Sequence, residues 1–312
     1  MGDATDRAGP AGGPGPADAL AALGEHDLPT RVLVLGMARR DGTIHAAEVA
    51  SVAEACRRSP EQVRSCLRRL VADRLFAREG TGPRAVYRPT PAGLAALGAF
   101  VERARLAVAQ DRAGSPWDGR RHLAAFAVPE ARRAARDALR ERLGALGGAA
   151  VHNGLYVSPR PWGKDVVAAA DRLGVAEHLT LATTESLQVR GVDEPRAIAA
   201  ELWPIDALAA KYGRFVDRWG AVPDQLAGMA ARRERLPDWR LLPGALAMGL
   251  AYLSCFEADP VLPPELLPHP WPGRTARDVL ARSREAARAL RAGEQPPALF
   301  RGFDDLVLSL TD

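Results

Sequence analysis

A helix with a well-marked N-terminus constrains the fold of this chain most. Ser59, Pro60 and Gln62 combine an N-cap hydroxyl, a proline suited to the first helical turn and a glutamine three residues after the cap, which together form a capping box. The apolar side chains that follow recur at helical spacing and form one stripe: Val63, Cys66, Leu67, Leu70 and Val71. The pattern predicts an amphipathic helix over residues 60–74 that buries this stripe in a small core.

The face opposite the stripe is polar and rich in arginine. Arginine can form two hydrogen bonds with guanine, glutamine can do the same with adenine, and serine can bind either base. The residues that we expect at base edges and the adjacent phosphates are Gln62, Ser65, Arg68 and Arg69, with Arg64 and either Arg57 or Arg58 at the DNA backbone. A solvated surface helix in an arginine-rich protein is the alternative interpretation.

The segments around this helix have the order helix, helix, helix, hairpin. Residues 30–39 and 46–57 show the spacing of short amphipathic helices, and residues 75–78 and 84–88 are predicted as two strands around the turn at 79–83. This is the order of elements in a winged helix-turn-helix.

The hairpin has its own candidate contacts. Arg78 and Arg84 flank a tip of small residues, which would allow close approach to a phosphate ridge or a minor groove. Tyr87 is expected to pack its ring against the body of the domain, with its hydroxyl near a phosphate. Taken singly, each of these residues has a structural explanation, but together they indicate nucleic-acid binding.

Positive charge is concentrated in the same part of the chain. The whole sequence has a formal net charge of +4, yet residues 31–110 contain 14 arginines and seven acids, a net charge of +7. Only two of the 42 basic residues are lysines, so basicity alone says little about function. Its concentration in one segment is what binding to a polyanion requires.

The remaining sequence predicts an α+β chain of several domains. Residues 1–27 are poor in large apolar side chains and are expected to be a disordered leader, followed by the winged-helix DNA-binding domain at 28–110. Strand and helix patterns alternate over residues 117–192, which predicts a ferredoxin-like α/β domain. Residues 196–312 are mainly helical in pattern, with a proline-dense interruption.

Within the central domain the predicted order begins with a strand at 122–128 and a helix at 129–143. A second strand at 149–157, a helix at 166–173 and a third strand at 179–189 follow. Residues 111–119, which contain glycine, serine and proline, are predicted to be a linker.

Catalytic, metal and cofactor sites are not predicted. Three cysteines without CxxC spacing are expected to be buried thiols in a reducing compartment. The first strand of the central domain has no acid that could hold a catalytic cation, and Ser158 precedes proline instead of lying in a nucleophile elbow. With neither an uncharged apolar span nor a secretory signal, the protein is expected to be cytoplasmic and free of membrane.

Several motifs give the chain a resemblance to a known family. The segment from Ser59 to Leu70 is accompanied by Tyr87 and by Thr-Pro-Ala-Gly at 90–93. More specific motifs follow: Trp-Asp-Gly-Arg at 117–120, Val-Pro-Glu at 128–130, Gly-Leu-Tyr-Val-Ser-Pro at 154–159, Trp-Pro-Ile-Asp at 203–206, and the proline-rich tract at 259–273. In these motifs the chain resembles the PaaX-type transcriptional regulators.

The resemblance implies a fold and a function. It implies a winged helix, a central ferredoxin-like domain related in fold to small CRISPR-associated nucleases, and a helical C-terminal domain. It also implies a homodimer that represses transcription, classically of phenylacetate catabolism, and that leaves its DNA on binding an aryl-coenzyme A thioester. No residue of this chain is assigned to the effector.

Our hypothesis from the sequence is therefore a sequence-specific regulator that binds double-stranded DNA, forms a homodimer and is released by an acyl-CoA or related effector. Two alternatives stay open at this stage. One is a metal-dependent nuclease on the ferredoxin-like domain, and the other is a winged helix that binds protein partners.

Overall fold

The chain divides into two compact units. The computed structural model describes residues 30–113, 117–292 and 299–303, so the expected leader at 1–27 lies outside the described residues. Unit 1 comprises Met1–Leu97, Trp219–Leu250 and Val279–Val307, and unit 2 comprises Gly98–Arg218, Ala251–Asp278 and Leu308–Asp312. Four helices contribute residues to both units: α5 (Pro91–Ala113), α9 (Ile205–Trp219), α11 (Asp238–Phe256) and α12 (Pro272–Leu290).

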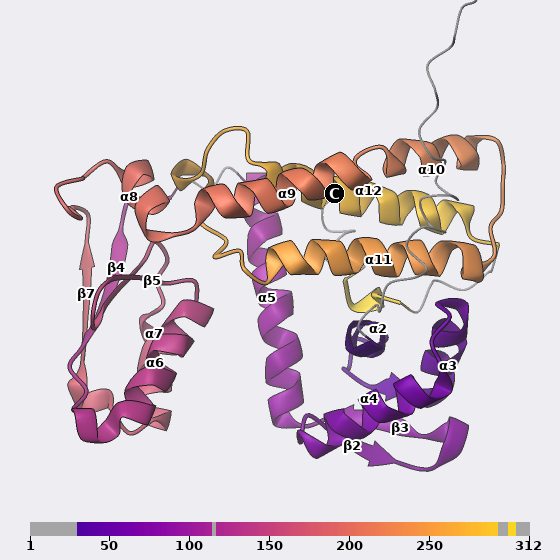
Figure 1. The fold of residues 1–312 in the computed structure, drawn as a ribbon, viewed down its shortest axis with the longest axis horizontal. Helices are drawn as coiled ribbons and strands as arrows, with labels where there is room; N and C mark the ends of the chain where they lie inside the picture. The colour runs from indigo at the N-terminus through magenta and orange to yellow at the C-terminus, as the bar shows by residue number, and fades with distance from the viewer. Residues whose placement is uncertain (1–29, 114–116, 293–298, 304–312) are drawn as a thin grey trace, which may run out of the picture. The chain divides into compact units, whose positions relative to one another are not determined.

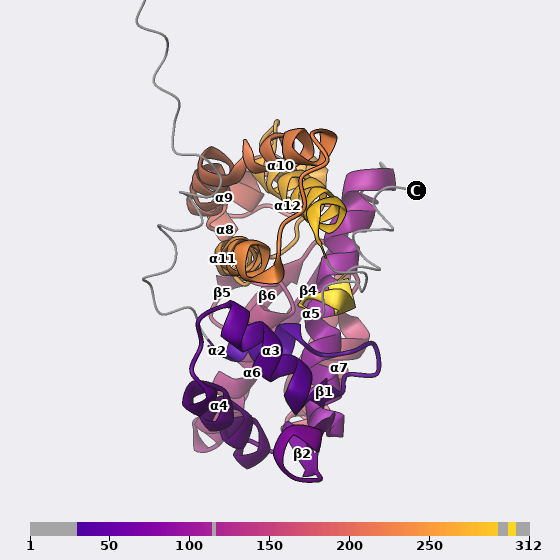
Figure 2. The same cartoon turned by 90° about the vertical axis from the view of Figure 1, so that its right-hand side faces the viewer.

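Unit 1 contains three short helices and a small antiparallel sheet (Figures 1 and 2). The strands lie in the order β1-β3-β2, with β3 paired to both neighbours. In chain order the elements are α2 (Thr30–Gly36), β1 (Ile44–His45), α3 (Ala46–Ala55), α4 (Pro60–Ala72), β2 (Phe76–Glu79) and β3 (Val86–Pro89). Helix α10 (Val222–Ala231) also belongs to this unit.

The helices of unit 1 end earlier than the sequence pattern predicts. The first ends at Gly36 instead of residue 39, the second at Ala55 instead of 57, and the third at Ala72 instead of 74. Helix α3 ends because Arg57 takes a left-handed backbone with φ 54°, and the following amide, that of Arg58, returns to the carbonyl of Ala53.

The hairpin is also shorter than predicted. Residues 82–84 form a 3-10 turn, so the second strand begins at Val86 instead of residue 84. The first strand runs over Phe76–Glu79, one residue later than expected. Arg84 therefore lies in the connection between the strands and not within one of them.

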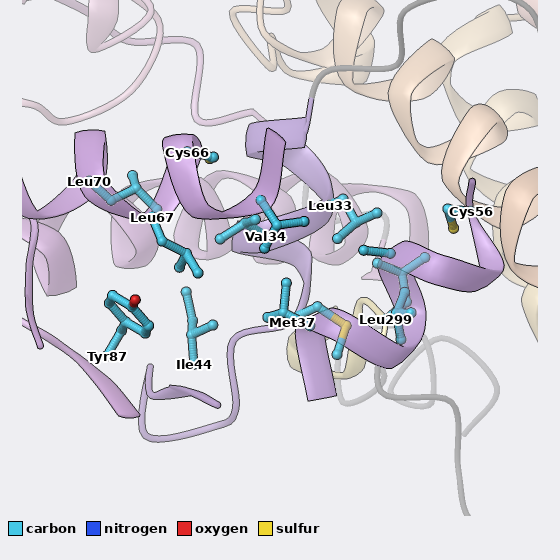
Figure 3. Close-up of a cluster of buried hydrophobic side chains, with 14 of the residues drawn as sticks. Leu33, Val34, Met37, Ile44, Cys56, Cys66, Leu67, Leu70, Tyr87 and Leu299 are labelled. Atoms are coloured by element: carbon cyan, nitrogen blue, oxygen red, sulfur yellow. The ribbon is translucent and has the colours of Figure 1, made fainter. Parts of the chain in front are cut away.

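The core of unit 1 is built on α2 and closed by residues far along the chain (Figure 3). Leu33, Val34 and Met37 are fully buried there, in one cluster with Leu67 and Leu70 of α4 and with Leu299. These contacts bury the apolar stripe of α4 that the sequence predicts.

The segment at residues 299–303 fits tightly into this core. The Phe300 amide donates to the Gly36 carbonyl at 2.6 Å, and its ring packs against two glycines, Gly36 and Gly249. A Cβ added at Gly36 would lie 2.7 Å from the ring, and one at Gly249 would lie 2.8 Å from it. Both positions therefore need glycine because of this close approach.

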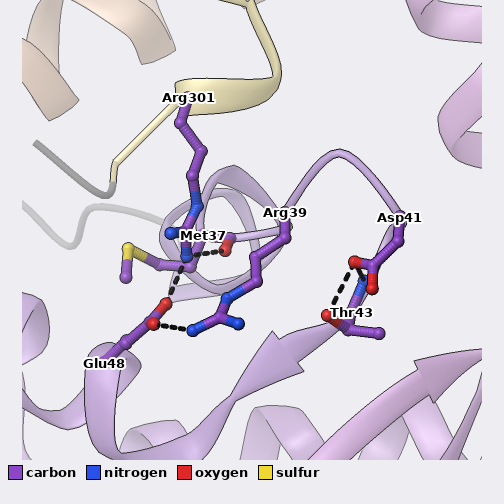
Figure 4. Close-up of polar contacts among 6 residues, drawn as sticks. All are labelled: Met37, Arg39, Asp41, Thr43, Glu48 and Arg301. Carbon is purple, nitrogen blue, oxygen red and sulfur yellow. Dashed lines mark hydrogen bonds and ion pairs between the residues drawn. The ribbon is translucent and has the colours of Figure 1, made fainter. Parts of the chain in front are cut away.

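An arginine clamp fastens the same segment to α3 (Figure 4). The Glu48 carboxylate accepts hydrogen bonds from both Arg39 and Arg301, and Arg301 also donates to the Met37 carbonyl at 3.2 Å. Burial alone would raise the pKa of Glu48, but the hydrogen bonds from the two guanidinium groups hold this pKa below its ordinary value. Asp41 closes the nearby loop by accepting from the Thr43 hydroxyl at 2.7 Å.

Unit 2 contains a four-stranded antiparallel sheet with a β-α-β-β-α-β order of elements (Figure 1). The strands lie in the order β5-β6-β4-β7, the ferredoxin-like arrangement expected from the sequence. Helices α6 and α7 cover one face and share a core with it. The elements are β4 (Arg121–Phe126), α6 (Arg133–Ala145), β5 (Ala149–His152), β6 (Leu155–Ser158), α7 (Gly163–Arg172) and β7 (Leu179–Thr184).

Three expectations for this region are wrong in detail. Residues 149–157 form two strands, because the chain reverses at Asn153 and Gly154, where Gly154 has φ 79°. The third predicted strand ends at Thr184 instead of residue 189. The predicted linker starts too early, since α5 continues to Ala113.

Helices α8 (Pro195–Leu202) and α9 (Ile205–Trp219) follow the sheet, as the helical pattern beyond residue 196 predicts. The proline-dense tract separates α11 from α12 and holds one short 3-10 turn, Pro264–Leu266. Among the described helices, α11 alone has the length and apolar composition of a membrane span, but 56% of that stretch is buried inside the protein, as in a helix that fills a core.

Unit 2 buries several polar groups among its helices. Arg277 of α12 forms a two-bonded ion pair with Asp111 of α5, at 2.5 and 2.8 Å, and these side chains are only 10% and 14% exposed. The Tyr212 hydroxyl donates to Asp259 at 2.8 Å. Arg103 donates to the main-chain oxygens of Phe256 and Asp259 at 2.8 and 2.6 Å. These arginines thus bond to groups within the fold.

Candidate nucleic-acid interface

Helix α4 begins with the capping box that the sequence predicts. The Ser59 hydroxyl accepts from the Gln62 amide at 3.2 Å, and the Gln62 side-chain oxygen accepts from the Ser59 amide at 3.0 Å. Val63, Cys66 and the two following leucines are buried, while Val71 is half-buried at the edge of the core. The cap and the stripe together fix which face of α4 points outward.

The outward face presents the predicted side chains to solvent. Arg64, Arg68, Arg69 and Gln62 are exposed, and Ser65 is half-buried. The Arg69 guanidinium donates to the Ser65 hydroxyl one turn earlier, at 3.4 Å. The face therefore carries guanidinium, hydroxyl and amide groups side by side, as base recognition in a major groove requires.

Gln62 is more constrained than we expected. Its side-chain oxygen accepts from the Ser59 amide, so the side-chain amide is turned back toward the cap. A two-bonded contact with adenine needs both the side-chain oxygen and the NH2 group, so Gln62 would have to give up the cap to make it.

The hairpin presents two arginines that have no ion-pair partner among the described residues. Arg78 and Arg84 are both exposed. The tip between the strands contains Gly80 and Gly82, with φ 75° and 58°, so the chain there has little bulk. Tyr87 is only 8% exposed and belongs to the core cluster, so its ring packs on the body as expected.

Acidic partners on this surface were not anticipated from the sequence. On α4, Arg64 and Arg68 both face Glu61, and on the hairpin Arg88 donates to Glu79 at 2.7 Å. Spacing of three residues on a helix is the signal that could have revealed the Glu61–Arg64 pair. The cross-strand pair depends on hairpin register, since Glu79 lies opposite Val86 and Arg88 opposite Ala77.

Two arginines in left-handed backbone flank α4. Arg57 precedes the helix and Arg74 follows it, with φ 54° and 56°. Both are exposed, whereas Arg58 is half-buried. Of the two residues expected at the DNA backbone, Arg57 is therefore the more accessible.

Two family models match the chain over adjacent segments. Residues 114–199 match the PaaX protein central Cas2-like domain, and residues 203–293 match the PaaX-like protein C-terminal domain. Together they span more than half of the sequence. The chain belongs to the PaaX family. Membership of this family suggests a transcriptional regulator.

One solved structure supports the fold of this PaaX-family chain. An uncharacterized protein, Rv0674 from Mycobacterium tuberculosis, aligns with a TM-score of 0.53 and 22% sequence identity, over 84% of this chain and 96% of that one. At this identity the likeness shows the fold alone. No curated protein matches the sequence. The matched family models start at residue 114, so the identity of the α2–β3 region rests on its own geometry.

The Cas2-like sheet of this PaaX-family protein has no acid on its first strand, which reads Arg-His-Leu-Ala-Ala-Phe over β4. Within the described ranges, no group of three or more His, Cys, Asp or Glu side chains is arranged to hold a metal ion. The cysteines Cys56, Cys66 and Cys255 are buried free thiols, as predicted, and burial raises the pKa of each; that of Cys56 rises to about 12.

A small apolar pocket with a volume of about 20 Å³ lies in unit 2. Trp117 and Trp203 contribute to its wall together with Leu187, Ile198 and Leu266. Arg121 also lines it and stacks on the Trp117 ring, with its guanidinium carbon 4.7 Å from the ring centroid. The pocket thus offers an aromatic and aliphatic surface beside one cation.

Proposed function

We propose that this protein is a sequence-specific DNA-binding transcriptional regulator whose α4 enters the major groove as the recognition helix of a winged helix-turn-helix. The observation that carries the proposal is the outward face of α4, where a capped helix presents Ser65, Arg68 and Arg69 to solvent. The order α2, β1, α3, α4, β2, β3 and the pairing of the three strands agree with this type of domain.

The hairpin extends the same surface. Arg78 and Arg84 lie on a segment that would reach the phosphate ridge or the minor groove beside the groove filled by α4, and Tyr87 supports this segment from the core. Arg64 and Arg57 would contact the backbone near the start of the helix. Family membership supports a regulatory role for such binding.

The test is selection of duplexes from a randomised library, followed by titration of the enriched duplex and of a scrambled one. We expect Arg69→Ala to weaken binding of the enriched duplex by about 1 to 3 kcal/mol and to relax the preference at one base pair. Arg233→Ala, which changes an exposed arginine outside the proposed interface, is the matched control. A wild-type protein that enriches no sequence would refute the proposal.

Salt dependence separates DNA binding from a protein-docking role. A surface that neutralises several phosphates loses affinity steeply as salt rises, because counterions are released on binding. We expect a steep negative slope of log affinity against log salt for the enriched duplex. A flat slope would favour the alternative in which the winged helix binds protein partners.

The proposal includes a homodimer and a small-molecule effector. Two copies would present two α4 helices to half-sites about one helical turn apart, or a multiple of that spacing. An acyl-CoA is the proposed effector because the resemblance to the PaaX-type regulators implies one, and no described residue is assigned to it. Because this regulator reads genomic DNA, we expect it to act in the cytoplasm.

The effector is tested by titrating aryl-CoA and aliphatic acyl-CoA thioesters, with free coenzyme A as the control. We expect one thioester class to weaken binding of the enriched duplex and to shift the melting temperature of the protein. If no thioester does either, this part of the proposal is wrong, while DNA recognition by α4 stands or falls on the selection experiment.

A further inference from the structure

Glu61 lies on the basic outward face of α4, at its N-terminal end. It is the second residue of the helix and its side chain is 69% exposed. One carboxylate oxygen is 2.7 Å from a guanidinium nitrogen of Arg64, and the other is 3.6 Å from one of Arg68. The hydrogen bond from Arg64 lowers the pKa of this carboxyl, so it is ionised at neutral pH.

A negative charge at this place opposes simple attraction to DNA. Phosphates bind arginine wherever they meet it, whatever the sequence, and this gives most non-specific affinity. Glu61 repels the same phosphates and occupies two of the arginines that would bind them. Exposed ion pairs of this kind stabilise a fold little, so the two ion pairs alone do not account for an acid in such a position.

Carboxylates have a specific use in a major groove, since they accept a hydrogen bond from the amino group of cytosine. The arginines that Glu61 holds lie three and seven residues further along α4 and prefer guanine. Resting on the proposed function, we propose that Glu61 is a specificity-determining residue: it lowers affinity for DNA in general and favours sites that place a cytosine amino group opposite it.

Glu61 also has a structural role that makes a different prediction. An acid in the first turn stabilises a helix through the dipole, and its removal would lower the melting temperature slightly without changing base preference. Glu79 supplies a matched control on the hairpin, because it is 55% exposed and likewise holds an arginine, Arg88, at 2.7 Å. Glu61→Gln and Glu79→Gln each remove one negative charge and keep the side-chain shape.

The experiment measures the affinities of the wild type, E61Q and E79Q for the enriched duplex and for a scrambled duplex, at two salt concentrations, with melting curves to verify folding. For E61Q we expect tighter binding of the scrambled duplex and a fall of about tenfold in the ratio of specific to non-specific affinity. For E79Q we expect both affinities to rise by the same factor. A library selected with E61Q should lose a cytosine preference that the wild type shows.

The outcomes separate this inference from the proposed function. A wild type that selects no sequence refutes the proposed function and this inference with it. A selective wild type whose E61Q variant keeps the same affinity ratio and the same selected sequence refutes the inference alone. Equal changes for E61Q and E79Q would also overturn it, because net charge would then explain the effect.

Discussion

The arginines of the two units differ in what they bind. On α4 of unit 1 the arginines are exposed and bind side chains of the same helix. Arg69 donates to the Ser65 hydroxyl, and Arg64 donates to the Glu61 carboxylate. In unit 2, Arg277 and Arg103 are bonded to a buried carboxylate and to main-chain carbonyls. Exposed pairs are weak enough to exchange for a ligand, whereas breaking a buried pair strongly destabilises the fold. Arginine content alone therefore says nothing about which surface binds DNA.

The largest expected effect concerns the buried ion pair between Asp111 and Arg277. Asp111→Asn should destabilise the protein by about 3 to 5 kcal/mol, because it leaves the Arg277 guanidinium buried without its counter-charge. Urea unfolding measures this loss. DNA affinity of the folded fraction should stay at the wild-type value.

A double variant checks the reason for that loss. Asp111→Leu combined with Arg277→Met replaces both charges by apolar groups and should recover most of the stability, since no unpaired charge remains. Equal free energies of unfolding for the single and double variants would mean that lost packing, and not an unpaired charge, destabilises the protein. The difference between the exposed and buried arginine pairs would then be smaller than we infer.

Glu48 is intermediate in burial between the buried Asp111 and the exposed Glu61, with 28% of its side chain exposed. Glu48→Gln should cost about 1 to 2 kcal/mol at neutral pH, because two charge-assisted hydrogen bonds are weakened. Since folding lowers the pKa of Glu48 below 4.5, its contribution is present above that pH and is lost as the pH falls through the lowered value. The wild type and variant should therefore converge in stability once the pH falls below the lowered pKa of Glu48, as chemical unfolding over a pH series would show.

Two arginines with left-handed backbone, Arg57 and Arg233, should stabilise the protein when they are replaced by glycine. Arg57→Gly and Arg233→Gly should each stabilise the protein by about 0.5 to 1 kcal/mol, since glycine tolerates a φ of 54° or 58° that a Cβ disfavours. Only Arg57→Gly should also weaken DNA binding on all sequences and reduce the salt slope by about one. Equal DNA affinities for the two variants would mean that Arg57 does not contact DNA.

The smallest effect concerns the thiols. Because Cys56, Cys66 and Cys255 are buried and their pKa values are raised, iodoacetamide at pH 8 should label none of them in the folded protein. In urea all three should react, as mass spectrometry would measure. Fast labelling of Cys66 in the folded state would mean that α4 separates from its core.

Local signals in the sequence predict much of this molecule. The capping box at Ser59, the apolar stripe of α4 and the alternation of strands and helices in the central domain depend on neighbouring residues, and the structure has all three. The hairpin at Asn153 was missed because the apolar pattern continues on both sides of it, although Asn-Gly is itself a strong turn signal. The recognition role of α4 stays a prediction.

Long-range contacts could not be predicted in the same way. Nothing near Glu48 in the sequence points to Arg301, which lies 253 residues away. The same holds for Asp111 and Arg277, 166 residues apart. The conflict at Gln62 is different, since the sequence predicts both the capping box and the outward face, and the capping box already uses the Gln62 side-chain oxygen.

The fit of Phe300 into unit 1 has a consequence for synthesis. Met37 and Arg301 are 264 residues apart, so a ribosome must add that many residues before the core around α2 can close. The first helices to leave the ribosome therefore keep part of their apolar surface open until residues 299–303 have been translated. The core of unit 1 is therefore completed after every element between α2 and Leu299 has been translated.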